Sequence, residues 1–343
     1  MFLNSPQRYS RSLINRTGGT ILFYWLISIA ISTFAMTFYT VLYIVFTADP
    51  ASLSGGADTQ EVLSHLESDL LFNSVLILVS PLLAFVTALI GSILTRVKLR
   101  PLLQPSRLQA RAFAVITITI LGLSSVSSYL VYPIDAFLSL FNFSIKPPDF
   151  LQLPVDQPLY LFLYVIGICI AAPVAEEMLF RGVILHALRP YGNGFAILIS
   201  ALFFGLIHGN FSQAPGAFVI GIALGIVTLR TRSLLPAIFI HLVNNTISVV
   251  EEYLAIVLQF TDAVIIIIDA IIIIVAILLL SLNWSKIKDF LSIFQVRQAQ
   301  ELSPQESSPF WRVRWRCFWT SWPMLIALFV CILLLLVNGI QPL

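Results

Sequence analysis

The sequence predicts an all-α protein, a polytopic bundle of membrane-spanning helices, and two observations carry that prediction. First, 58% of the 343 residues are hydrophobic and 10% are charged, with a mean hydropathy of +0.94. Soluble domains carry about 25% charged residues. Second, the apolar residues fall in runs of about 20, the length at which a helix crosses a bilayer. We therefore expect a membrane protein surrounded by lipid, with no nucleic-acid partner.

Apolar runs of sufficient length predict about nine spans, within a range of about eight to ten. They lie at 20–46, 70–95, 112–132, 158–188, 195–209, 216–230, 234–250, 253–282 and 323–340. The runs 195–209 and 216–230 are short, which favours helices shielded inside the bundle.

The runs divide the chain into three regions. Polar residues at about 284–322 predict a cytoplasmic linker before the last span. The regions are an N-terminal membrane region with about three spans (1–150), a core (151–262) and C-terminal spans (263–343).

Positive charge is distributed unevenly over the predicted loops. Most of the 19 lysines and arginines fall on one side, beginning with Arg8, Arg11 and Arg16 before the first span. Loops rich in lysine and arginine face the cytoplasm. This distribution predicts a cytoplasmic N-terminus and an external C-terminus. We expect a multi-pass protein of a bacterial plasma membrane.

Ionisable and amide side chains are concentrated in the spans between 158 and 250, where they are costly and usually face a bundle interior. Glu177 and Arg181 are four residues apart, which favours an ion pair along one helix face. Glu176 is turned about 100° away from Glu177, which leaves it free for proton transfer. The other polar residues of this block are His186, His208, His241, Asn244 and Asn245.

Two further helices bring polar groups to the same level. Phe204 and His208 share one helix face, and His241 and Asn245 share another. At a rise of about 1.5 Å per residue, these groups and Glu176 reach overlapping depths. This convergence predicts a catalytic cavity within the bundle.

The set supports two ways of hydrolysing an acyl bond. In one, His208, His241 and Glu176 hold a divalent metal, such as zinc, that acidifies a water. In the other, Glu176 and His208 activate the water directly, while His241 and Asn245 donate to the oxyanion. The alternative function is a transporter with a proton or cation relay. Its best support is Asp269 in VIIIIDAIIII, unless this residue makes an interhelix hydrogen bond.

A family resemblance rests on three motifs, EEMLFRG (176–182), FGLIH (204–208) and HLVNN (241–245). They resemble the E-E-x-x-x-R, F-x-x-x-H and H-x-x-x-N motifs of the CPBP family, the CAAX-protease and bacteriocin-processing (Abi) membrane endopeptidases. The resemblance covers about residues 155–260.

The resemblance implies a role for each motif residue. Glu176 and His208 would activate the water, and His241 and Asn245 would stabilise the oxyanion or share a metal site. Glu177 and Arg181 would support this geometry. The implied activity is cleavage of a peptide bond in a membrane-associated protein or peptide, with or without a lipid group.

Overall fold

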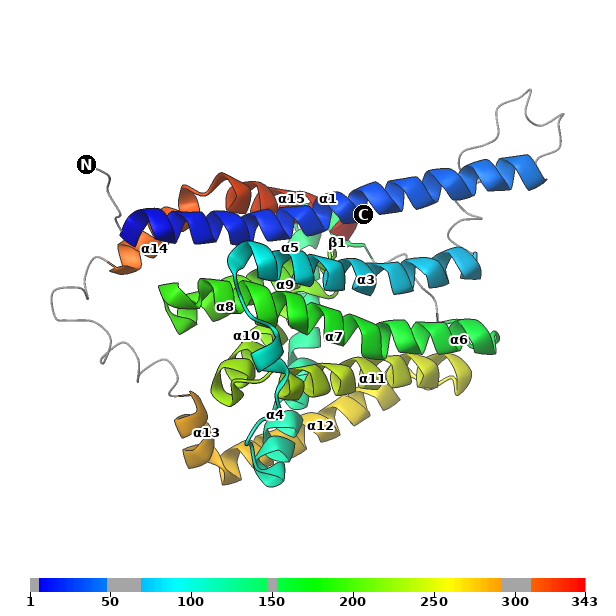
Figure 1. The fold of residues 1–343 in the computed structure, drawn as a ribbon. Helices are drawn as coiled ribbons and strands as arrows, with labels where there is room; N and C mark the ends of the chain where they lie inside the picture. Colours follow the sequence, from blue (N-terminus) through cyan, green and yellow to red (C-terminus); the bar gives the residue numbers. More distant parts are fainter. Residues whose placement is uncertain (1–5, 48–68, 147–152, 292–309, 343) are drawn as a thin grey trace.

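The described part of the chain is a bundle of helices with a short β ribbon (Figure 1). The computed structural model describes residues 6–47, 69–146, 153–291 and 310–342. The predicted boundary at 150/151 and residues 292–309 of the predicted linker lie outside these ranges. Within these ranges, seven helical segments are long and apolar enough to cross a membrane: Arg11–Leu42, Leu70–Thr95, Ala110–Ser139, Pro158–Tyr191, Ala214–Thr231, Asp262–Leu282 and Trp322–Gly339. The predicted fold class, a polytopic helix bundle, is confirmed.

The elements follow one another in this order. The first part of the chain forms α1 (Pro6–Thr47), α3 (Leu70–Thr95), η1 (Arg100–Leu103), α4 (Ala110–Ser128), α5 (Val131–Ser139) and β1 (Phe143–Ile145). The middle forms α6 (Pro158–Val165), η2 (Ile166–Ala171), α7 (Ala172–Glu177), η3 (Met178–Ile184), α8 (Leu185–Leu188), η4 (Arg189–Tyr191), α9 (Asn193–Leu206), α10 (Ala214–Thr231) and α11 (Leu235–Val257). The last part forms α12 (Asp262–Leu282), α13 (Trp284–Leu291), α14 (Phe310–Trp319), α15 (Trp322–Gly339) and β2 (Ile340–Pro342).

The predicted count of about nine spans is reached only if two further helices are included. Helix α9 is apolar but has 14 residues, which is short for a span. Helix α11 has 23 residues, but polar side chains such as His241, Asn244 and Asn245 lower its hydropathy. Helix α11 carries His241 and Asn245 of the predicted site, and His208 follows directly after the end of α9.

The boundary between the two spans predicted at 234–250 and 253–282 is wrong. Helix α11 continues to Val257, and α12 begins at Asp262. Gln259 has a left-handed backbone conformation with φ of 51°, which turns the chain between the helices. Thr261 is extended and Asp262 lies in the first turn of α12, where a carboxylate interacts favourably with the helix dipole.

The described parts of the predicted polar linker are mostly helical. The eight-residue α13 and the ten-residue α14 lie on either side of 292–309. Helix α14 packs against the bundle through Phe318, which is 2% exposed and makes edge-to-face contact with Phe195 of α9.

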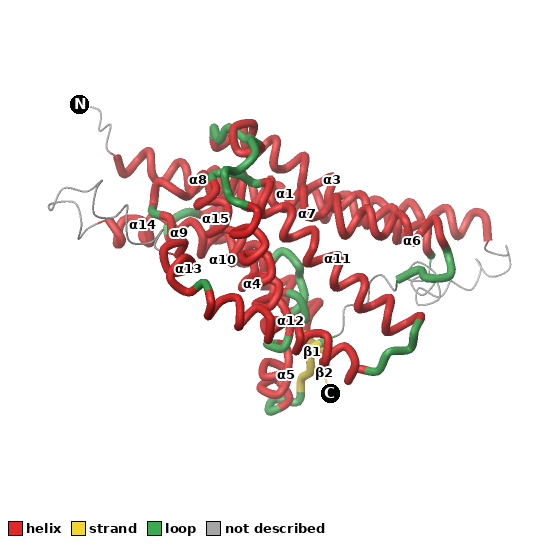
Figure 2. Tube along the Cα trace, turned by 90° about the horizontal axis from the view of Figure 1, so that it is seen from below, coloured by secondary structure: helices red, strands yellow, loops and turns green. Residues whose placement is uncertain are grey.

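The β ribbon was not predicted. Strands β1 and β2 pair antiparallel, with Ile145 opposite Ile340 and Phe143 opposite Pro342. The ribbon is continued by a hydrogen bond from the Lys146 amide to the carbonyl of Gly339. Figure 2 shows it beside α5 at the C-terminal end of the described chain. The two strands have three residues each, too few for alternation to be recognised in the sequence.

Close helix packing depends on small residues. Helices α1 and α15 lie side by side (Figure 1), and a Cβ added to Gly18 of α1 would lie 2.5 Å from the backbone nitrogen of Met324. Helices α4 and α12 meet at Gly122, where an added Cβ would lie 2.3 Å from the Cβ of Ala276. Small residues let membrane helices approach and gain van der Waals contact.

We expect Gly122→Val to destabilise the protein by about 1–3 kcal/mol, because the added atoms force α4 and α12 apart. The measurement is the thermal unfolding midpoint of the purified protein in one detergent. Gly19→Ala is the control, since a Cβ at Gly19 meets no atom within 4 Å. Equal midpoints for Gly122→Val and wild type would contradict the close packing of α4 on α12.

Candidate functional site

The long helical segment Pro158–Tyr191 is interrupted by two π-helical turns, η2 and η3. In these turns the Ala172 amide donates to the Gly167 carbonyl and the Leu185 amide donates to the Phe180 carbonyl, each five residues back. Such turns are rare and frequently mark functional sites. The six-residue α7, with the two adjacent glutamates at its end, lies between them.

Asn245 of α11 supplies a hydrogen bond that the helix lacks at its first interruption, η2. Pro173 has no amide hydrogen, and the Ala172 amide is already used by Gly167, so the helix has no donor for the Ile168 carbonyl. The side-chain amide of Asn245 donates to that carbonyl at 3.0 Å. A side chain on a neighbouring helix thus satisfies the group freed by the proline, as membrane helices require.

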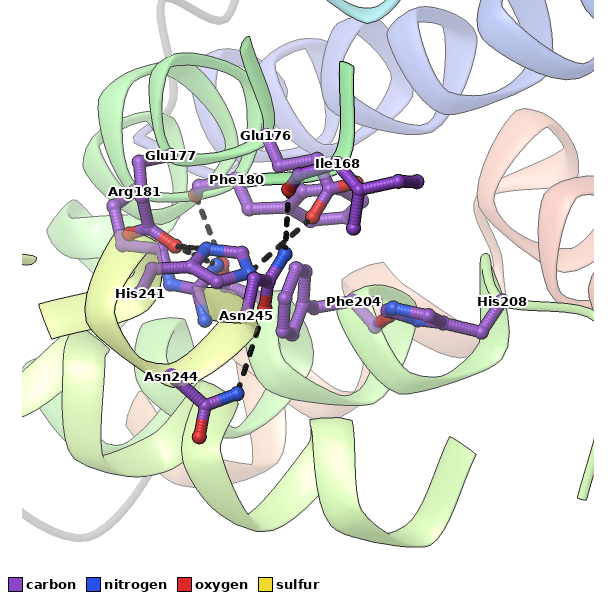
Figure 3. A network of polar contacts seen from close by, with 11 residues as sticks. Ile168, Glu176, Glu177, Phe180, Arg181, Phe204, His208, His241, Asn244 and Asn245 are labelled. Atoms are coloured by element: carbon purple, nitrogen blue, oxygen red, sulfur yellow. Dashed lines mark hydrogen bonds and ion pairs between the residues drawn. The ribbon is translucent and has the colours of Figure 1, made fainter. Parts of the chain in front are cut away.

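Glu177 lies at the centre of a buried polar network (Figure 3). Its Oε1 atom is 2.8 Å from Nη1 of Arg181, and both side chains are 0% exposed. The same oxygen accepts a hydrogen bond from Nδ1 of His241 at 3.0 Å. The predicted pair of Glu177 with Arg181 is present, and the structure adds His241 to it.

The guanidinium of Arg181 lies over an aromatic ring. Its Cζ atom is 4.1 Å from the ring centroid of Phe204, a cation–π contact. Among the described residues, none of the three guanidinium nitrogens of Arg181 has a hydrogen-bond partner, nor has Oε2 of Glu177, and Nη1 contacts Glu177 as an ion pair only. The ion pair and the aromatic face are therefore what stabilise this buried charge.

Glu176 approaches the other side of the same histidine. Its Oε2 atom is 3.8 Å from Nε2 of His241, and its side chain is 23% exposed. Because a carboxylate can only accept, the bond to Glu177 places the neutral ring's hydrogen on Nδ1. In the neutral His241 ring, Nε2 is then unprotonated and faces Glu176. The two glutamates thus approach opposite nitrogens of one imidazole.

His208 lies just beyond the end of α9 and apart from this pair. Its Nδ1 atom is 2.8 Å from the Phe204 carbonyl, which can only accept, so Nδ1 carries the hydrogen and Nε2 is left as an acceptor. Among the described residues, the structure records no hydrogen bond or ion pair between His208 and Glu176. The structure thus brings Glu176 to His241 and not to His208.

The Phe204 ring connects the two histidines. Its centroid is 5.3 Å from the His208 ring and 5.6 Å from the His241 ring, both edge-to-face (Figure 3). Sequence reasoning placed Phe204 on the face of His208 but gave it no role. Its motif position, four residues before the histidine, was the available signal.

The geometry does not fit a metal held by His208, His241 and Glu176. In the described parts of the chain, no group of three or more His, Cys, Asp or Glu side chains is arranged to hold a metal ion. The reason is steric, since the Phe204 ring contacts both imidazoles and Glu176 approaches His241 alone.

The remaining polar residues of the block have local partners. Nδ1 of His186 bonds to the carbonyl of Arg181 at 2.6 Å, in keeping with a packing role. The side-chain amide of Asn244 is 3.5 Å from Oδ1 of Asn245. Outside the block, Tyr129 donates to Asp269 at 2.9 Å between α4 and α12, which confirms an interhelix hydrogen bond for Asp269.

Comparison with known proteins supports one family for this region. Residues 158–247 match the family model described as type II CAAX prenyl endopeptidase Rce1-like. All the site residues from Glu176 to Asn245 lie in that match. The region 158–247 is thus similar to this family, and the match covers less than half of the chain.

One curated relative matches within a segment of similar length. The protein is "Putative membrane peptidase YdiL" of Bacillus subtilis (strain 168), 34% identical over 89 residues. The match covers 26% of this chain and 36% of that protein, so the chain spans little more than a third of the length of its curated relative. No solved structure matches the chain.

In the matched region, we expect Asn245→Ala to cost about 1–3 kcal/mol of stability, because it leaves the Ile168 carbonyl without a donor. Chemical denaturation in detergent measures the loss. In a Pro173→Ala background the restored backbone amide can take over, so the same substitution should cost less. Equal costs in both backgrounds would contradict the link between proline and asparagine.

A second expectation concerns the buried ion pair. Arg181→Leu leaves the Glu177 carboxylate without its cation and should destabilise the domain by about 3–5 kcal/mol. The double variant Arg181→Leu/Glu177→Gln removes both charges and should recover part of that loss. Thermal unfolding of the three proteins decides, and a double variant no more stable than Arg181→Leu would argue against the pairing.

Proposed function

We propose that the protein is an intramembrane endopeptidase that hydrolyses a peptide bond of a membrane-associated protein or peptide. The match to the Rce1-like model over 158–247 supports this activity. The observation that carries the proposal is a partly exposed carboxylate, Glu176, facing an imidazole, His241, that a second carboxylate orients. A carboxylate–imidazole pair of this kind suits proton transfer to and from a reacting water.

The proposal divides the work between the adjacent glutamates by their exposure. The Glu177 side chain is 0% exposed and paired with Arg181, whereas the Glu176 side chain is 23% exposed. Glu176 is therefore the carboxylate that a water and a substrate can reach. Glu177 is a positioning residue, which holds the His241 ring through Nδ1.

The proposed reaction conserves its protons as follows. The water oxygen forms a bond to the scissile carbonyl carbon while Glu176 takes one of its protons. When the tetrahedral intermediate breaks down, the carbon–nitrogen bond is cleaved and the leaving amine receives that proton. Nε2 of His241 lies 3.8 Å from Glu176, so a closer approach of the two side chains or one bridging water would let them share the proton.

Asn245 and His208 complete the proposed site. The amide nitrogen of Asn245 carries two hydrogens, and the Ile168 carbonyl uses one of them. The second can donate to the developing oxyanion, a role to which His241 contributes when Nε2 is protonated. His208 keeps Nε2 as a free acceptor, which supports a role in orienting the attacking water.

The test is cleavage of two peptides that differ only in a prenyl group. Purified protein in lipid nanodiscs is incubated with a farnesylated CAAX peptide and with the unmodified peptide, and mass spectrometry identifies the products. We expect the wild type to cut at least one peptide and Glu176→Gln to lower the rate by about 10²-fold or more. The peptide that is cut shows whether the lipid is recognised.

Glu252→Gln is the matched control, because its carboxylate contacts the Tyr164 hydroxyl at 3.3 Å and no site histidine. It should cleave at the wild-type rate. Unfolding midpoints of both variants must equal that of the wild type for the comparison to hold. Wild-type cleavage by Glu176→Gln would refute the proposed base. Glu176-dependent proton flux in proteoliposomes without proteolysis would favour the transporter.

A further inference from the structure

The turn that carries His208 is held by a buried asparagine. Asn210 is 2% exposed, and its side-chain amide donates to the His208 carbonyl at 2.9 Å and to Oε1 of Gln213 at 3.0 Å. Its Oδ1 accepts from the Gln213 amide at 2.9 Å. Gly209, between the two, has φ of 65°, a left-handed conformation that favours glycine. Hydrogen bonds within the turn therefore fix the path of the chain from α9 to α10.

The last span abuts this turn from outside the Rce1-like match. Gly339, the final residue of α15, is in contact with Phe211, the residue after Asn210. A Cβ added to Gly339 would lie 2.7 Å from Cδ2 and 3.2 Å from the backbone nitrogen of Phe211. Glycine is what lets α15 reach the turn, and any side chain there must push Phe211 away.

The end of α15 is itself anchored. Directly after Gly339 the chain enters β2, which pairs with β1, and the Gly339 carbonyl accepts from the Lys146 amide at 3.0 Å. Strand β1 is held in turn, because the Ile145 amide donates to Oδ1 of Asp135 at 2.7 Å. Gly339, which contacts Phe211, is therefore held in place by the hydrogen-bonded ribbon. Figure 2 shows this ribbon where the described chain ends.

We propose that the end of α15 positions His208. Gly339 packs against Phe211, and this contact fixes the adjacent turn that Asn210 holds. This inference rests on the proposed function for the importance of His208, but the contact itself does not. Gly339 and Phe211 are positioning residues. They act through the turn and touch no reacting group.

The experiment follows the imidazoles directly. The chain has four histidines, so protein labelled with ¹⁵N at histidine gives few ring signals, and the His208→Gln variant assigns those of His208. We expect Gly339→Ala and Phe211→Ala each to shift the His208 ring signals in nanodiscs and to leave those of His241 unchanged. Phe211→Ala withdraws the ring without inserting an atom, so it remains informative if Gly339→Ala folds poorly.

Activity provides the second readout. A displaced catalytic group lowers turnover without weakening substrate binding, so we expect kcat to fall about tenfold or more with KM within about twofold. In the Phe211→Ala background, Gly339→Ala should have a smaller effect than in the wild type, because the ring is gone and only the contact with the backbone nitrogen at 3.2 Å remains. Gly19→Ala is the matched control, since a Cβ there meets no atom within 4 Å.

The two proposals can fail separately. His208 signals unchanged in both Gly339→Ala and Phe211→Ala would overturn the positioning role, whatever the activity. Shifted His208 signals in a wild-type fold that cleaves neither peptide would support the positioning role and count against the endopeptidase. A kcat loss in Gly19→Ala as large as in Gly339→Ala would also overturn the inference, because the effect would not be specific to the contact.

Discussion

The buried carboxylate of Glu177 is the interaction on which the rest of the site depends. One oxygen faces both the Arg181 guanidinium and the His241 ring, and so joins η3 to α11. In a low-dielectric interior a charge without its partner costs several kcal/mol, so these three groups must be in place together. The guanidinium then lies over Phe204, whose ring packs against His241 and His208. A single ion pair thus orders side chains on three helical segments.

The first interruption of the helix that presents the glutamates can be traced to one residue. Pro173 deprives the helix of a donor, the preceding turn widens into η2, and Asn245 supplies the missing hydrogen bond to Ile168. The side-chain amide of Asn245 carries a second hydrogen that this bond does not use. Irregular backbone inside a membrane is tolerated where protein groups satisfy it, and here the satisfying group belongs to the site.

The helix bundle and part of the candidate site could be predicted from the sequence. The other features could not, for physical reasons. Hydropathy predicted the helix bundle, and a spacing of four predicted the pair of Glu177 with Arg181. The ideal rotation of 100° per residue separated Glu176 from Glu177, but it took no account of π turns or of α11. It therefore could not show that both glutamates approach one ring, His241, from opposite sides. The ribbon joins residues about 195 positions apart, a distance over which three-residue strands leave no pattern.

The β ribbon constrains the order in which the molecule can be completed. Strand β1 is synthesised long before β2. In the described chain, four helical segments that are long and apolar enough to cross a membrane lie between the two strands. During that interval the residues of β1 have no strand to pair with. Closing so long a loop is entropically unfavourable until the intervening helices have packed and brought its ends together. Pairing of β1 with β2 is therefore a late step of biogenesis. It links the end of the last span to the segment that follows α5.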